Sequence, residues 1–129
     1  MSMDLKLDYD PSIIYTKFEA ENIDLLCMDI DQVVLSRDCR PLALIETTHC
    51  ATKVDNPRFI AAIDKRMNGS PQQKLVLDVA RLLGVNAYWV TFELDCERFG
   101  IRLLDGDRWF FGDKQEYVNW IHSLERGQA

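Results

Sequence analysis

The sequence contains no apolar run long enough to span a membrane and no closely spaced pair of cysteines. Crossing a bilayer takes about 20 consecutive apolar residues, and the N-terminus lacks the basic and then apolar pattern of a secretion signal. We therefore expect no membrane association and a cytoplasmic location. The four cysteines, Cys27, Cys39, Cys50 and Cys96, include no CxxC pair, and a reducing compartment keeps such thiols free.

Positive charge is also scarce, since the formal net charge is −6 and the sequence pI is near 4.8. Proteins that bind nucleic acid through their overall field are usually basic, so contact with DNA would have to come from a local patch. Arg58, Lys65, Arg66 and Arg81 lie in two expected helices and form a candidate patch. An ordinary solvated helix face has the same composition, and the sequence leaves both interpretations open.

What the chain does contain is enough apolar sequence for one core, since 47% of its 129 residues are hydrophobic. No repeat, linker or low-complexity tract divides it, so we predict a single domain over residues 1–129. Apolar periodicity and turn signals predict the order strand, strand, helix, helix, strand, strand, strand, helix. The expected strands are 23–36, 41–48, 86–94, 99–104 and 108–111, and the expected helices are 57–68, 71–83 and 113–125.

The two middle helices carry clear signals at both ends. Asn56 and Ser70 are N-cap residues followed by proline, and Gly69 and Gly84 follow the expected helix ends. A strand that leaves for helices and returns as a buried strand predicts a crossover connection, with helices over at least one face of the sheet. We predict a mixed β-sheet flanked by helices, in the α/β class bordering on α+β.

Three acidic residues interrupt the first two apolar strands. Asp29 and Asp31 lie in the first strand, and Glu46 ends the apolar run "PLALIE". If "RDCR" closes a hairpin through a loop of even length, Ser36 lies opposite Pro41 and Asp31 lies opposite Glu46. The hairpin would therefore bring two carboxylates together.

The same count places Asp29 opposite Thr48, and alternation puts all four side chains on one face. Directly opposed carboxylates repel each other. A shared proton would raise the pKa of one carboxyl, whereas a divalent cation such as Mg²⁺ would bind both and activate water for attack on a phosphate. The plainer interpretation is a solvated strand edge with Glu46 at a strand end.

The segment "DIDQVVLSRDCRPLALIETT" resembles the motif region of the PD-(D/E)XK nuclease superfamily, in particular its small phage and mobile-element members. In that family a strand ending in Asp, a hairpin and a strand ending in Glu-x-Lys precede helices and a further buried strand. The specific resemblance covers residues 27–48, and topology extends it through Glu93. It implies a restriction-endonuclease-like core, DNA as substrate, and phosphodiester hydrolysis that depends on Mg²⁺ or Mn²⁺.

By this resemblance Asp31 corresponds to the metal-binding Asp and Glu46 to its acidic partner. The backbone carbonyl of Thr47 corresponds to the third ligand, and Asp29 to a supplementary acid. The family often places a Gln at the start of the helix before the buried strand, where it points into the site. Gln72 is the candidate for that position, and an ordinary polar residue of the first helical turn is the alternative.

The sequence departs from the family at Thr48, which stands where the family has the lysine that orients the attacking water. Lys53, in the following loop, is the candidate for a relocated lysine, whereas Lys74 is expected to point away and Lys65 has no predicted position. Two outcomes follow. The chain is either an active nuclease with a relocated or dispensable base, or an inactive fold that binds nucleic acid or protein, as a homodimer or with a phage or host partner.

Two weaker signals complete the candidates. Cys39, His49 and Cys50 are zinc-ligand types, although their spacing matches no standard module. Alternation turns His49 away from the acids, so we expect it to be structural or exposed. Six aromatic residues could stack on bases but at this spacing more often fill a core: Trp89, Trp109, Phe110, Phe111, Tyr117 and Trp120.

Overall fold

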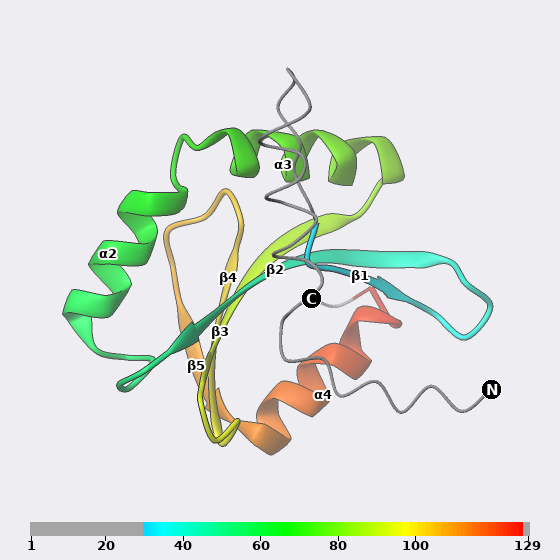
Figure 1. The fold of residues 1–129 in the computed structure, drawn as a ribbon. Coiled ribbons are helices and arrows are strands. Elements are labelled where there is room, and N and C mark those ends of the chain that lie inside the picture. The colour runs from blue at the N-terminus through cyan, green and yellow to red at the C-terminus, as the bar shows by residue number, and fades with distance from the viewer. Residues whose placement is uncertain (1–29, 128–129) are drawn as a thin grey trace, which may run out of the picture.

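A computed structural model describes residues 30–127, which form one five-stranded mixed sheet and its covering helices (Figure 1). The strands follow one another across the sheet as β1 (Gln32–Leu35), β2 (Pro41–Cys50), β3 (Asn86–Glu93), β4 (Arg98–Leu103) and β5 (Phe110–Asp113). β2 and β3 are parallel, and the other neighbouring strands are antiparallel. The predicted mixed sheet of the α/β or α+β class is therefore confirmed. The expected helix or irregular segment after Pro11, and the part of the first expected strand before residue 30, lie outside the described residues.

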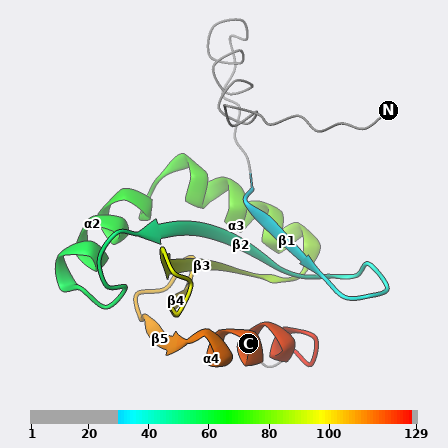
Figure 2. The same cartoon turned by 60° about the horizontal axis from the view of Figure 1, so that its bottom comes forward.

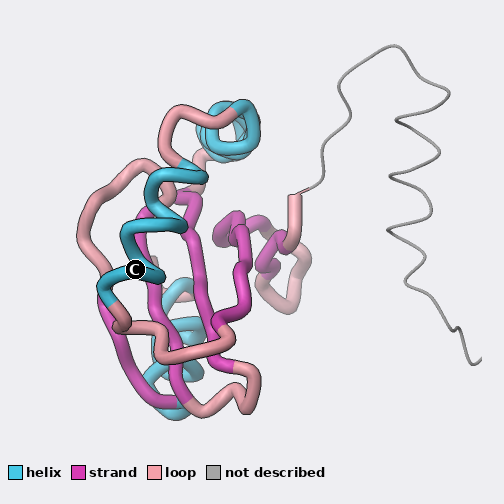
Figure 3. Tube along the Cα trace, turned by 60° about the vertical axis from the view of Figure 1, so that its left-hand side comes forward, coloured by secondary structure: helices cyan, strands magenta, loops and turns pink. Residues whose placement is uncertain are grey.

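Helices cover both faces of the sheet (Figure 2). α2 (Pro57–Met67) and α3 (Pro71–Leu83) connect β2 to β3 on one face, and α4 (Lys114–Leu124) packs on the other. In Figure 3 the strands form a layer against which the helices pack. As predicted, the side chains of Asn56 and Ser70 accept backbone N–H groups at the starts of α2 and α3. No helix within residues 30–127 combines the length and apolar composition needed to cross a membrane.

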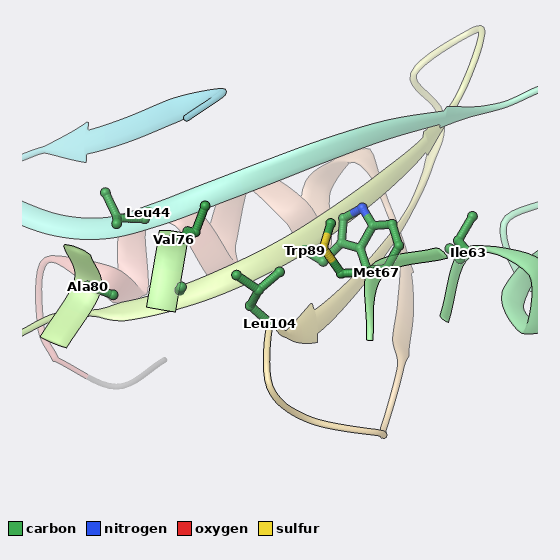
Figure 4. Packing of buried hydrophobic residues seen from close by; sticks show 8 residues of the cluster. Leu44, Ile63, Met67, Val76, Ala80, Trp89 and Leu104 are labelled. Carbon is green, nitrogen blue, oxygen red and sulfur yellow. The ribbon is translucent and has the colours of Figure 1, made fainter. Parts of the chain in front are cut away.

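Two buried clusters hold the helices to the sheet, because alternate residues of a strand point to opposite faces. On one face, Leu44 of β2 and Trp89 of β3 pack against α2 and α3 (Figure 4). On the other, Ile45 and Tyr88 pack toward Leu124 of α4. Glu46 and Thr48 follow Leu44 at spacings of two and four residues in β2, so they share the face covered by α2 and α3. Figure 4 shows the first cluster, which includes Leu44, Ile63, Met67, Val76, Ala80, Trp89 and Leu104.

Arg102 of β4 lies beside Trp89 of this cluster and links the sheet to α2. Its guanidinium carbon lies 5.3 Å from the ring centroid of Trp89 and 5.5 Å from that of Trp109. Its Nη1 donates a 2.8 Å hydrogen bond to Asp64 Oδ1 of α2. These contacts fix the position of the helix that carries Arg66.

The expected bounds of β2 and β5 differ from the structure by two residues. β2 continues through His49 to Cys50, two residues beyond its expected end, because its last residues pair with β3 as far as Glu93. β5 begins at Phe110 and ends at Asp113, two residues later than expected at each end. In both places the neighbouring strand, rather than local composition, decides where pairing stops.

Candidate functional site

The hairpin of β1 and β2 brings Asp31 beside Glu46. Gln32 is paired with Ile45 and Val33 with Leu44. This register agrees with the prediction, and Asp31 directly precedes the paired strand. The backbone N–H of Asp31 donates to Glu46 Oε1 at 3.4 Å.

The expected pairing is wrong next to the turn. A bulge between Val34 and Leu35 leaves Leu35, rather than Ser36, opposite Pro41. The turn between these paired residues, 36–40, is odd in length, and the bulge shifts the register by one residue in compensation. The two shifts cancel, so the outer end of the hairpin has the predicted register.

The side chain of Asp31 forms hydrogen bonds with β2 just beyond the residues that pair with β1. Its Oδ2 accepts hydrogen bonds from the backbone N–H of Thr47 at 2.9 Å and from the Thr47 hydroxyl at 3.2 Å. In a strand the N–H and C=O of one residue point to the same side. The carbonyl of Thr47 therefore points toward the edge at which Asp31 lies.

Glu46 is buried, with 5% of its surface exposed. Gln72 Nε2, from the first turn of α3, donates to its Oε1 at 3.0 Å. Burial, followed by the charge of Asp31, raises the pKa of Glu46 from 4.5 to about 7, and the Gln72 bond opposes this rise. Near neutral pH, Glu46 is therefore only partly ionised, and a bound cation would favour its ionised form.

Thr48 is held by two donors on the same face. Its Oγ1 accepts from Trp89 Nε1 at 3.0 Å and from Arg66 Nη2 at 3.3 Å. Sequence patterns assign Arg66 only to a basic helix face, because its contact with Thr48 depends on how α2 packs. Lys53 is exposed after β2, and its side chain forms no hydrogen bond or ion pair within residues 30–127. Its catalytic role stays a prediction.

The other basic candidates lie at the surface, and most of the aromatic candidates pack against the two clusters. Lys74 forms a 3.0 Å ion pair with Asp78 on the exposed side of α3, and Lys65 is exposed. His49 is exposed, with its ring 6.4 Å from that of Phe92. Of the six aromatic candidates, Trp89 is fully buried. Trp109, Tyr117 and Trp120 are partly buried against the two clusters. Phe110 and Phe111 are exposed.

The zinc alternative is wrong. Cys39 lies in the turn before β2, and Cys50 ends the same strand. A strand rises about 3.3 Å per residue, so the two thiols are roughly 30 Å apart and cannot share an ion. More generally, the part of the chain from residue 30 to 127 contains no group of three or more His, Cys, Asp and Glu side chains arranged around a metal.

The oxygen atoms that are predicted to be ligands suit Mg²⁺, which prefers oxygen. Mg²⁺ is commonly held by one or two carboxylates and keeps several waters, so it does not need three protein side chains. Asp31, Glu46 and the Thr47 carbonyl place oxygen atoms of this kind at one edge of β2, and their role as ligands stays a prediction. Asp29, the fourth predicted ligand, lies outside the described residues.

Comparisons of the chain with models of protein families, with curated proteins and with solved structures found no match. The functional interpretation therefore depends on the residues and contacts of this site.

Proposed function

We propose that this chain is a nuclease-like protein of the PD-(D/E)XK type that hydrolyses DNA phosphodiester bonds with Mg²⁺ or Mn²⁺. The observation that carries the proposal is the pairing of a buried carboxyl, Glu46, with a second one, Asp31, at the edge of β2. The charge of Asp31 raises the pKa of Glu46, so the two carboxylates repel each other when both are ionised, and a divalent cation between them removes the repulsion. The motif resemblance over residues 27–48 supports the same pair, within a restriction-endonuclease-like core.

In this proposal Asp31, Glu46 and the Thr47 carbonyl hold the cation, and Gln72 orients the Glu46 carboxylate through its amide. The cation, when bound, would polarise a phosphoryl oxygen and lower the pKa of a bound water. Hydrolysis joins the water oxygen to phosphorus and breaks the bond from phosphorus to the leaving oxygen, which takes up a proton. Asp29 would be a supplementary ligand, and Lys53 a relocated lysine.

Binding without cleavage is the second candidate function. The observation that favours it is Thr48, because a neutral hydroxyl does not replace the charge of the lysine expected there. In this case the chain would retain the site geometry and bind DNA, a second copy or another protein.

The test measures metal binding and cleavage separately. Asp31→Asn keeps an oxygen that can accept the Thr47 amide, and Glu46→Gln keeps the shape of the buried side chain. Asp107→Asn, in the exposed loop after β4, is a matched loss of one charge elsewhere. Mn²⁺ binding is measured by calorimetry, and cleavage is measured on supercoiled plasmid DNA with Mg²⁺ or Mn²⁺.

We expect the wild-type chain and Asp107→Asn to bind Mn²⁺ and cut DNA, and both site variants to lose each property. Mn²⁺ binding without cleavage would favour the second candidate. Equal Mn²⁺ binding by the wild-type chain and both site variants would remove the metal site, and with it the proposed function.

A further inference from the structure

The hydroxyl of Thr48 lies next to the two carboxyls and has an unusual set of partners. Thr48 is two residues after Glu46 on the same face of β2, so their Cβ atoms are about 7 Å apart. Both of its partners, Arg66 Nη2 and Trp89 Nε1, can only donate hydrogen bonds. Thr48 Oγ1 therefore accepts twice.

This arrangement determines what the hydroxyl proton can do. A threonine hydroxyl has two acceptor lone pairs and one proton to donate. Arg66 and Trp89 occupy both lone pairs. Within residues 30–127 the hydroxyl donates to no acceptor of the protein. Thr48 is half-buried, so its proton is available to a molecule bound beside Glu46.

Arg66 adds positive charge to the same place. Its guanidinium has five N–H donors, one of which is directed at Thr48, and the residue is exposed at the end of α2. A basic residue in the last turn also stabilises a helix through the helix dipole. Lys65 occupies that last turn as well, and within residues 30–127 Thr48 accepts from Arg66 but not from Lys65. A change at Lys65 therefore separates the two roles of Arg66.

We propose that Thr48 and Arg66 form an oxyanion-binding pair that takes a non-bridging oxygen of a phosphate group beside Asp31 and Glu46. The pair supplies one neutral and one charged donor, and hydrogen bonds from guanidinium to phosphate are strong. A phosphodiester has two non-bridging oxygens, so one can face the carboxylate site while the other meets this pair. The identity of the phosphate as part of a DNA backbone rests on the proposed function.

The test uses the indole N–H of Trp89, which donates to Thr48 and reports on it by NMR. The full chain is titrated with inorganic phosphate at pH 6 without metal, where Glu46, with a pKa of about 7, is mostly protonated. The variants are Arg66→Gln and Thr48→Val. Lys65→Gln is the matched loss of charge, and Thr48→Ser keeps the hydroxyl that Thr48→Val removes.

We expect the Trp89 indole signal of the wild-type chain to shift saturably with phosphate. Arg66→Gln and Thr48→Val should weaken binding at least tenfold, while Lys65→Gln and Thr48→Ser stay within about threefold of the wild-type chain. The proposal is overturned if the wild-type signal does not respond, or if Lys65→Gln weakens binding as much as Arg66→Gln does.

The two proposals fail in different measurements. A phosphate response with no Mn²⁺ binding would leave the oxyanion-binding pair and remove the nuclease assignment. Mn²⁺ binding that requires Asp31 and Glu46, with no phosphate response, would do the reverse.

Discussion

Arg102 and Asp64 form an ion pair of 2.8 Å in which the arginine side chain is fully buried and the aspartate is partly exposed. Trp89 and Trp109 flank the guanidinium. Burial lowers the pKa of Arg102, and the charge of Asp64 opposes that change. The pair joins β4 to α2, the helix that carries Arg66, so the geometry of the candidate site depends on it.

Replacing Asp64 should therefore destabilise the protein strongly. Asp64→Ala removes the carboxylate that pairs directly with a buried guanidinium, and such losses cost about 3 kcal/mol or more. The free energy of unfolding, measured with urea, should fall by this amount. The control is Asp55→Ala, which removes an exposed partner 3.9 Å from Arg98 and should cost no more than about 0.5 kcal/mol. Equal losses in the two variants would contradict the structural role of the buried pair.

The stability of the metal-free chain should depend on the protonation of Glu46. Its pKa is raised from 4.5 to about 7, so the folded chain binds this proton more tightly than the unfolded chain does. Between these two pKa values the unfolded state loses its proton first, and the contribution of Glu46 to stability falls as pH rises. Above about pH 7 the folded state has the full cost of the ionised, buried carboxylate.

Glu46→Gln removes this dependence. We expect the variant to be more stable than the wild-type chain at pH 8, by on the order of 2–3 kcal/mol, and the advantage to disappear below pH 4. Urea unfolding of both proteins at a series of pH values measures the difference. A difference that is constant with pH would show that Glu46 titrates normally in the folded state.

Thr91 should tolerate the loss of its hydroxyl. Its Oγ1 is buried and, within residues 30–127, has no hydrogen-bond partner. Burying an unsatisfied hydroxyl costs about 1–3 kcal/mol. We expect Thr91→Val, which has nearly the same shape, to raise the free energy of unfolding by about 1 kcal/mol. A loss of stability in thermal and urea unfolding would imply that the hydroxyl has a partner in solution, such as an ordered water.

A side chain at Gly100 should lower the free energy of unfolding. A Cβ built at this position would lie 2.7 Å from Thr91 Oγ1 and 3.1 Å from the ring of Phe111. We expect Gly100→Ala to cost about 1–3 kcal/mol through overpacking, measured by urea unfolding. Thr91→Val does not remove this contact, because its methyl group occupies the place of the hydroxyl. The double variant Gly100→Ala with Thr91→Ser tests whether a side chain free to turn away relieves the strain.

Much of the secondary structure could be predicted because its signals are local. The N-caps Asn56 and Ser70 and the prolines after them act within one helical turn, and the structure agrees with them. The register that brings Asp31 beside Glu46 follows from counting along one hairpin. The count was nevertheless incomplete, because an odd turn and a bulge between Val34 and Leu35 cancel each other.

Sequence alone determined which residues start the helices and which strand residues share a face, and it predicted that two carboxylates meet at one edge of β2 if the hairpin loop is even in length. These properties depend on short-range geometry and on the two-residue period of a strand. Only the tertiary structure decided that Glu46 is buried under Gln72 and that Arg66 reaches Thr48 from another helix. Burial and the partners of distant residues depend on how helices pack on the sheet, and no local pattern records that packing.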